Sequence, residues 1–168
     1  MTTNDKMEFV IELARKAMDT GEFPIAAAVF HGNELLASAY TTENAEGRYL
    51  VHADQKALME ADIKKLPIRS RWECELFINL EPCLMCLGMA ISSFIGSIYY
   101  SVEAISDGAV EFVRKEFEQR AINTSNPWRF PKISVGLMRD QSIQLFREYV
   151  ERFEGTPGIE WARTVAEM

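Results

Sequence analysis

Hydrophobic positions along the chain follow two periods in turn, and each period predicts a different kind of element. In some segments apolar residues recur every three or four positions, which predicts helices with one buried face. Between those segments lie short apolar runs of the length of β-strands. We expect helices at 7–20, from about 52, at 84–93, 109–120 and 140–153, and strands at 24–30, 34–40, 73–80, 97–102 and 132–138.

The order of these elements predicts the fold class. The first two strands are separated by His31, Gly32 and Asn33, which favours a hairpin with His31 as an ordinary turn residue. After an irregular polar loop at 41–48, strands and helices alternate, an order typical of a three-layer α/β fold. We expect Asp140 to cap the helix at 140–153.

The extent of the regular pattern suggests how the chain is divided. With 168 residues the chain has the size of one domain, and we expect residues 1–153 to form it. The segment 154–158, "EGTPG", then interrupts the pattern, so that 154–168 are expected to be a C-terminal tail. Its last ten residues, "IEWARTVAEM", predict a short helix that packs on the body or on a partner subunit.

Charge and hydropathy argue against two kinds of partner. The 18 basic and 25 acidic residues give a net charge of −7, which is the wrong sign for a protein that neutralises phosphates. The one compact basic cluster, 63–71, is interpreted as the solvated end of a helix and a turn. No apolar run approaches the length of about 18 residues that spans a bilayer. We therefore expect neither a nucleic acid nor a membrane as partner.

Cysteine usage points to metal or redox chemistry in a reducing compartment, for which we expect the cytoplasm. Cys83 and Cys86 form a Cys-x-x-Cys pair, whereas Cys74 is expected to be buried in a strand. The pair alone is compatible with a redox disulfide, a structural zinc site with four protein ligands, or two core cysteines. A thioredoxin-like unit would place the pair after the first strand, and a structural zinc would need a fourth ligand that the chain does not offer nearby.

His52, Cys83 and Cys86 thus remain as three ligands with a fourth position open, the arrangement of a catalytic zinc site. Zinc lowers the pKa of a bound water from about 15.7 towards 7, and the proton released needs a carrier. Asp54 lies two residues after His52 in the first turn of the expected helix. We interpret Asp54 as this proton carrier, which does not itself bind the metal.

These residues resemble the signature of the zinc-dependent cytidine deaminase superfamily, His-x-Glu followed by Pro-Cys-x-x-Cys. The likeness extends over about 8–153 and includes "EFPIAAAVF", "LFINLEPCLMCLGMAISSFIGSIYY" and "KISVGLMRDQ", which resemble segments of bacterial tRNA adenosine deaminases and guanine deaminases. The resemblance implies a five-stranded mixed sheet in an α/β/α sandwich and one zinc ion per chain between the starts of two helices. It also implies a homodimer.

The resemblance further implies hydrolytic deamination of a ring carbon, with Asp54 carrying the proton to the ring nitrogen and then to the leaving amine. Backbone groups of Ala53 and Cys83 would help to hold the tetrahedral intermediate. The substrate contacts implied by position are Phe23, Ala26, Ala27, Thr41, Ala53, Pro82 and Trp128. Glu81 is expected to have a structural role beside the metal loop.

The chain departs from the family pattern in three respects. Asp54 replaces the catalytic glutamate, and Thr41 replaces an asparagine that contacts the substrate, with Asn44 three residues out of register. The small residues that usually precede the histidine are replaced by Arg48, Tyr49, Leu50 and Val51. We interpret the last two changes as a reshaped, more apolar site, in which Tyr49 and Leu50 either face the substrate or pack in the core.

The sequence leaves three functions open. The first is deamination of a nucleobase, a nucleoside or a related small amino-heterocycle. The second is deamination of adenosine in tRNA, which the acidic charge and the replaced asparagine disfavour. The third is a zinc-binding scaffold protein with impaired catalysis, an alternative that the replacement of glutamate by Asp54 keeps open. The nearly all-apolar helix "CLMCLGMAISSF" independently favours a homodimer.

Overall fold

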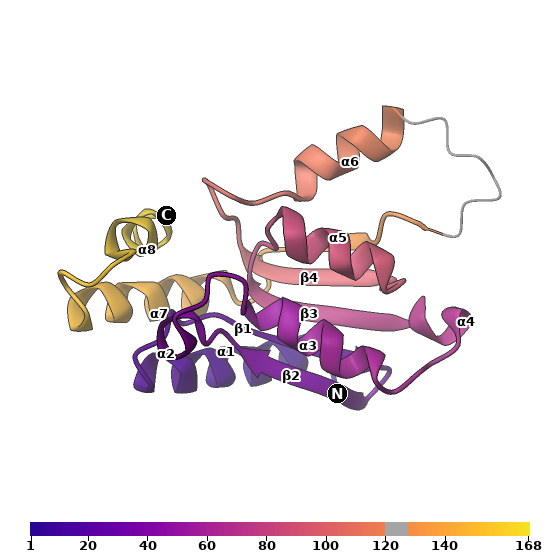
Figure 1. The fold of residues 1–168 in the computed structure, drawn as a ribbon, viewed down its shortest axis with the longest axis horizontal. Helices are drawn as coiled ribbons and strands as arrows, with labels where there is room; N and C mark the ends of the chain where they lie inside the picture. The colour runs from indigo at the N-terminus through magenta and orange to yellow at the C-terminus, as the bar shows by residue number, and fades with distance from the viewer. Residues whose placement is uncertain (120–127) are drawn as a thin grey trace.

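A five-stranded mixed sheet forms the centre of the computed structural model, which describes residues 1–119 and 128–168 (Figure 1). The strands lie in the order β2-β1-β3-β4-β5. The first two form an antiparallel hairpin, β1 pairs antiparallel with β3, and β3, β4 and β5 are parallel. Their bounds are β1 Ala26–His31, β2 Glu34–Tyr40, β3 Cys74–Leu80, β4 Ser97–Val102 and β5 Lys132–Val135. The expected five-stranded mixed sheet is confirmed.

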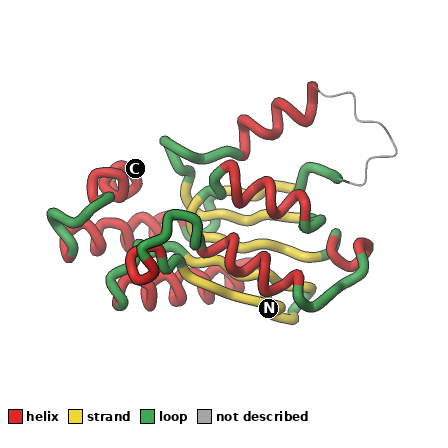
Figure 2. Tube along the Cα trace, in the orientation of Figure 1, coloured by secondary structure: helices red, strands yellow, loops and turns green. Residues whose placement is uncertain are grey.

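Helices cover both faces of this sheet (Figure 2). The helices α1 and α7 pack on one face, and α3 and α5 pack on the other. Alternation along β1 explains the two layers, because Ala26, Ala28 and Phe30 face the first pair whereas Ala27 and Val29 face the second. The helices are α1 Thr3–Asp19, α2 Glu43–Glu46, α3 Ala53–Asp62, α4 Ile68–Arg71, α5 Leu84–Ser92, α6 Val110–Gln119, α7 Arg139–Arg152 and α8 Ile159–Ala166.

Three local predictions are wrong. His31 does not lie in the hairpin turn but is the last residue of β1 and pairs with Glu34, so that the turn consists of Gly32 and Asn33. The segment expected as an irregular loop contains the short helix α2, which ends at Gly47 in the left-handed conformation with φ 60°. The helix α7 is not capped by Asp140, which lies in its first turn; the N-cap position is Met138, with φ 55° and no side-chain hydrogen bond. The sequence "NTSNPWRFP" predicts a loop at 123–131, of which residues 123–127 lie outside the described residues.

The C-terminal segment 154–168 lies against the body of the chain. Ile159, Ala162 and Val165 of α8 are buried in the same apolar cluster as α1 and α7. Trp161 packs at ring-centroid distances of 5.2 Å from Phe23 and 6.0 Å from Phe146. As a result, α8 lies beside the loop that precedes β1 (Figure 1). Among the described helices, none combines the length and apolar character that a membrane span requires.

A buried asparagine joins the end of β3 to two neighbouring segments. Asn79 accepts a hydrogen bond from the amide of Ala26 at 2.9 Å and donates to the carbonyl of Pro24 at 2.8 Å. The hydroxyl of Ser142 on α7 donates to the Asn79 carbonyl at 2.8 Å. These contacts fix the segment before β1 and the start of α7 against the sheet.

We expect Asn79→Ala to lower the free energy of unfolding by about 2–4 kcal/mol, because it leaves buried backbone groups of Ala26 and Pro24 without partners. Urea denaturation of the parent and variant measures this difference. Asn33→Ala, in the exposed hairpin turn, is the matched control and should change stability by less than about 0.5 kcal/mol. Equal stability of Asn79→Ala and the parent would contradict the structural role of this side chain.

Candidate active site

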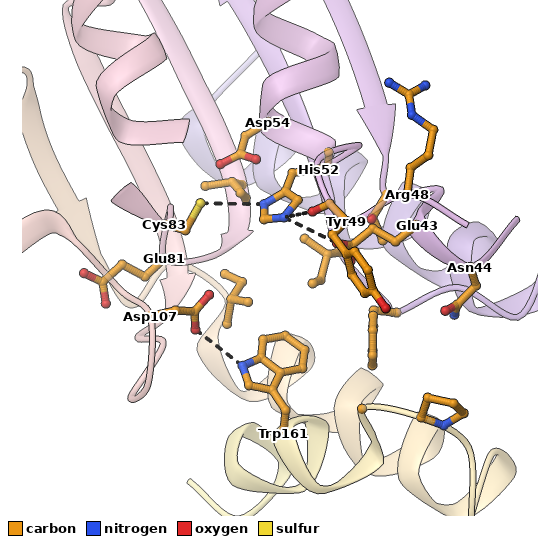
Figure 3. A pocket seen from close by; sticks show the side chains of 18 of the residues that line it. Glu43, Asn44, Arg48, Tyr49, His52, Asp54, Glu81, Cys83, Asp107 and Trp161 are labelled. Carbon is orange, nitrogen blue, oxygen red and sulfur yellow. Dashed lines mark hydrogen bonds and ion pairs between the residues drawn. The ribbon is translucent and has the colours of Figure 1, made fainter. Parts of the chain in front are cut away.

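Two helix N-termini meet at one edge of the sheet and bring the predicted metal ligands together. His52 is the N-cap residue of α3, and Cys83 is the N-cap residue of α5. Cys86 lies in the first turn of α5 and is fully buried. The short link from the end of β3 at Leu80 to α5 places both cysteines at the same end of the sheet as His52. Figure 3 shows Cys83 facing the His52 ring.

The spacing of the three side chains fits a tetrahedral zinc ion. His52 Nδ1 lies 3.6 Å from Cys83 Sγ and 3.7 Å from Cys86 Sγ. Ligand atoms at typical Zn–N and Zn–S distances, about 2.1 and 2.3 Å, are roughly 3.6 Å apart on a tetrahedron. The three ligand atoms all lie within 4.8 Å of one another. The donor set and its geometry therefore fit one zinc ion and leave its fourth position for another ligand.

The other ring nitrogen of His52 has two acceptors. Nε2 lies 3.1 Å from the carbonyl oxygen of Tyr49 and 3.4 Å from Oε1 of Glu43. With Nδ1 directed at the cysteines, Nε2 carries the ring proton and donates it to these oxygens. This arrangement selects the tautomer in which Nδ1 has a free lone pair for a metal.

The protonation equilibria of the trio indicate a site that attracts positive charge. The hydrogen bond from the Cys86 thiol, together with that from His52, lowers the pKa of Cys83 to about 4 although burial acts in the opposite direction. The pKa of Cys86 is raised by its hydrogen bond to Cys83 and by burial. Hydrogen bonds to Cys83 and then to Glu43 raise the pKa of His52 to about 10. Without a metal, a proton on His52 Nδ1 and the thiolate of Cys83 stabilise each other, and a bound zinc ion would replace that proton.

Asp54 lies beside the trio at the inner wall of the cavity (Figure 3). The residue is only 3% exposed, and this burial is the main cause that raises the pKa of its carboxyl to about 6. A hydrogen bond with the Cys86 thiol acts in the opposite direction. Its Oδ1 also accepts a hydrogen bond from the amide of Gln55 at 3.1 Å. A carboxylate so placed can exchange protons with a molecule bound at the metal position.

A cavity of about 520 Å³ opens in front of these residues. Of the predicted substrate contacts, Phe23, Thr41 and Ala53 line it. Ala26 and Ala27 are instead buried within β1, Pro82 is buried in the link to α5, and Trp128 does not line the cavity. Thr41 is 1% exposed and donates to the Val51 carbonyl at 3.3 Å.

The bulky residues before His52 do not pack in the core. Tyr49 is 88% exposed and Leu50 is 62% exposed, whereas Val51 is buried. Core packing of Tyr49 and Leu50 is therefore wrong, and of the two only Tyr49 lines the cavity. Asn44 also lines the cavity, but its side-chain amide donates to the Gly21 carbonyl at 3.0 Å.

Several cavity residues were not expected from the sequence. Pro157, Gly158 and Trp161 come from the C-terminal segment, and Asp107 comes from the connection between β4 and α6. The indole Nε1 of Trp161 lies 3.4 Å from Oδ1 of Asp107 and thereby links two walls (Figure 3). The sequence offers only a weak indication that the C-terminal segment lines the cavity. That indication is a single tryptophan in a short amphipathic helix after a segment that contains Gly and Pro.

Glu81 holds the connection after β4 in place, as expected of a structural residue. Its carboxylate accepts hydrogen bonds from the amides of Ala104 at 3.1 Å and Val110 at 3.0 Å. A Cβ at Gly108 would lie 2.3 Å from Glu81 Oε2 and 2.5 Å from the Ala104 carbonyl oxygen. Position 108 therefore requires glycine. The backbone of Gly108 also forms an isolated antiparallel β-bridge with the backbone of Cys83.

Known proteins of similar sequence and structure were compared with this chain. The family model of the cytidine and deoxycytidylate deaminase zinc-binding region matches residues 1–102. A tRNA-specific adenosine deaminase from Rickettsia typhi is 24% identical over 152 residues, which cover 89% of this chain and 99% of the relative.

Two solved structures have similar folds. One comes from a study of A-to-I editing by tRNA:A34 deaminases at the wobble position, with a TM-score of 0.69, 24% identity, and coverage of 84% of this chain and 98% of that one. The other is the guanine deaminase from Nitrosomonas europaea, with a TM-score of 0.67, 27% identity, and coverage of 88% and 84%. The predicted five-stranded cytidine deaminase-like fold is confirmed.

Thiol reactivity should distinguish Cys74, in the strand β3, from the cysteines of the metal site. Burial raises the pKa of Cys74 to about 11, so we expect this thiol to remain unreactive in the folded protein at pH 8. After zinc is removed by a chelator, a chromogenic disulfide reagent should modify Cys83, which is partly exposed and has a lowered pKa, whereas all three cysteines should react after denaturation. Cys74→Ala should retain one zinc per chain, whereas Cys83→Ala should lose it. A Cys83–Cys86 disulfide in the isolated protein would contradict the metal site.

Proposed function

The chain belongs to the cytidine and deoxycytidylate deaminase family, and we propose that its substrate is a nucleobase, a nucleoside or a related small amino-heterocycle. The reaction is hydrolytic deamination, in which water replaces the exocyclic amine and ammonia is released. The observation that carries the choice of substrate is the cavity of about 520 Å³ between the metal trio and α8. This volume lies within the range of about 300–1,000 Å³ typical of small-molecule sites.

His52, Cys83 and Cys86 would hold the zinc ion. Zinc, when bound, polarises a water molecule and lowers its pKa to about 7. Asp54 would accept the first proton of the attacking water and deliver it to the ring nitrogen. It would then carry the second proton, from the new hydroxyl of the tetrahedral adduct, to the leaving amine as the C–N bond breaks and the C=O bond forms. The amide of Ala53 at the start of α3 has no acceptor within its helix, so it can stabilise negative charge that develops on the substrate.

A tRNA adenosine deaminase is the second candidate, favoured by the names of the relatives. The distribution of charge supports the small substrate instead. Glu43, Asp54 and Asp107 line the cavity, and the guanidinium of Arg48, the basic residue among its linings, pairs with Glu46 at 2.9 Å. The basic cluster at 63–71 includes α4, which lies at the opposite end of the sheet from α8 (Figure 1). A phosphate backbone entering the cavity would meet carboxylates.

The third possibility is the zinc-binding scaffold, and Asp54 distinguishes it. We expect Asp54→Asn to retain stoichiometric zinc and to lower kcat by at least about 100-fold, because an amide cannot carry the proton. The substrate is identified by measuring ammonia release from a panel of nucleobases, nucleosides and pterin- or triazine-like heterocycles. The zinc content is measured by elemental analysis.

The same panel includes a tRNA anticodon stem-loop as a separate arm. Turnover of the stem-loop alone would replace the first candidate with the second. No turnover of any compound by the zinc-loaded parent would favour the scaffold. Full activity of Asp54→Asn would show that another group carries the proton.

We further propose that the protein is a cytoplasmic homodimer in which 154–168 acts as part of the catalytic unit. All three cysteines are free thiols, which suits a reducing compartment. Large apolar side chains are exposed on α5, on α6 and on the connection between β4 and α6: Leu84 is 57% exposed, Phe112 is 61% exposed and Ile105 is 70% exposed. An interface between two copies would remove such surface from water.

Light scattering at micromolar concentration should give twice the chain mass of 19.2 kDa. Leu84→Glu should shift the protein toward the monomer, because it places a charge at the centre of the proposed interface. Leu35→Glu, on the edge strand β2, is the control and should leave the mass unchanged. A parent protein that is monomeric at all concentrations would contradict the dimer.

A further inference from the structure

Glu43 contacts a metal ligand but has no part in the mechanism above. We propose that Glu43 is a positioning residue that strengthens zinc binding by holding His52 through its outer ring nitrogen. This inference rests on the zinc site of the proposed function. Glu43 Oε1 lies 3.4 Å from His52 Nε2, on the side of the ring opposite the two cysteines (Figure 3).

The geometry assigns this role because a ligating imidazole has one proton to donate. With Nδ1 facing the cysteines at 3.6 and 3.7 Å, the proton is on Nε2, where the Tyr49 carbonyl and the Glu43 carboxylate are its acceptors. The carbonyl orients the ring without adding charge. The carboxylate adds a negative charge, which makes the imidazole a stronger donor to a metal.

Neighbouring residues hold Glu43 in place. Glu22 is 1% exposed and accepts hydrogen bonds from the amides of Asn44 and Ala45, at 3.0 and 2.7 Å. These bonds fix the first turn of α2, to which Glu43 belongs. The amide of Thr42 donates to the Val51 carbonyl at 3.3 Å and closes the loop onto the residue before His52. Glu43 therefore approaches the ring on a fixed backbone.

The charge of Glu43 is available to His52. The nearby cation Arg48 pairs with Glu46 at 2.9 Å, and Lys56 donates to the hydroxyl of Thr42 at 2.9 Å. Among the described residues, the ion-pair partner of Glu43 is His52. Glu43 is also a poor candidate for a direct ligand, because it faces the nitrogen that points away from the trio.

Zinc affinity measured by competition with a chromophoric chelator tests the proposal. We expect Glu43→Gln, which keeps the size and removes the charge, to weaken zinc binding by about 10- to 100-fold. Glu43→Asp should bind with intermediate affinity, since it keeps the charge at a greater distance. Glu60→Gln, at an exposed position of α3, is the control for removal of a negative charge and should bind zinc as the parent does.

Unfolding of the metal-free proteins is measured in parallel, because a merely structural role would lower stability without changing the affinity of the folded state for zinc. Equal zinc affinity in Glu43→Gln and the parent would overturn the proposal and leave the Tyr49 carbonyl as sufficient. A raised KM with unchanged zinc affinity would also overturn it, by assigning Glu43 to the substrate. Absence of zinc binding in the parent would overturn the metal site and, with it, this inference.

Discussion

The structure depends on one geometric requirement: the imidazole nitrogen of His52 and the sulfur atoms of Cys83 and Cys86, from a later part of the chain, must lie within 4.8 Å of one another. Neither α3 nor α5 can meet this requirement alone, because the nitrogen comes from the start of α3 and both sulfur atoms come from the start of α5. Both helices must therefore begin at the same edge of the sheet and pack side by side. The buried side chains of β1, β3 and β4 hold them there, with Leu58, Leu87 and Ile98 in one apolar cluster. Much of the core therefore serves to hold the starts of α3 and α5 close together.

Carboxylates near the site differ in role because they differ in their partners. Glu22 and Glu81 each accept two backbone amides, so their oxygens are committed to holding loops. Glu43 meets an imidazole at the rim of the cavity. Asp54 is buried beside the thiols, and the recorded hydrogen bond to a backbone amide involves one of its two oxygens. Of these four acids, Asp54 is the one suited to move a proton, because it lies beside the metal position and holds neither a loop nor the imidazole in place.

Local patterns predicted much of this molecule. Strand β4 begins and ends where the apolar run "SIYYSV" does, and the ligand trio followed from the small number of cysteines and histidines. The failures have a common physical cause. The helix α2 is too short to show a period, and its start depends on Glu22, more than twenty residues away. The exposure of Tyr49 and the approach of Trp161 to Asp107 are likewise set by tertiary contacts, which periodicity does not report.

The sheet separates two apolar clusters, and this division bears on how such a protein can diversify. The metal ligands belong to helices of the α3/α5 side, whereas α8 is anchored in the cluster of α1 and α7. A cavity wall is thus built on a different core from the one that supports the reacting groups. Changes at Gly158 or Trp161 can alter the shape of the cavity with little strain on the ligands. Selection, or a designer with a library confined to the last dozen residues, could therefore explore new substrates while the hydrolytic machinery stays intact.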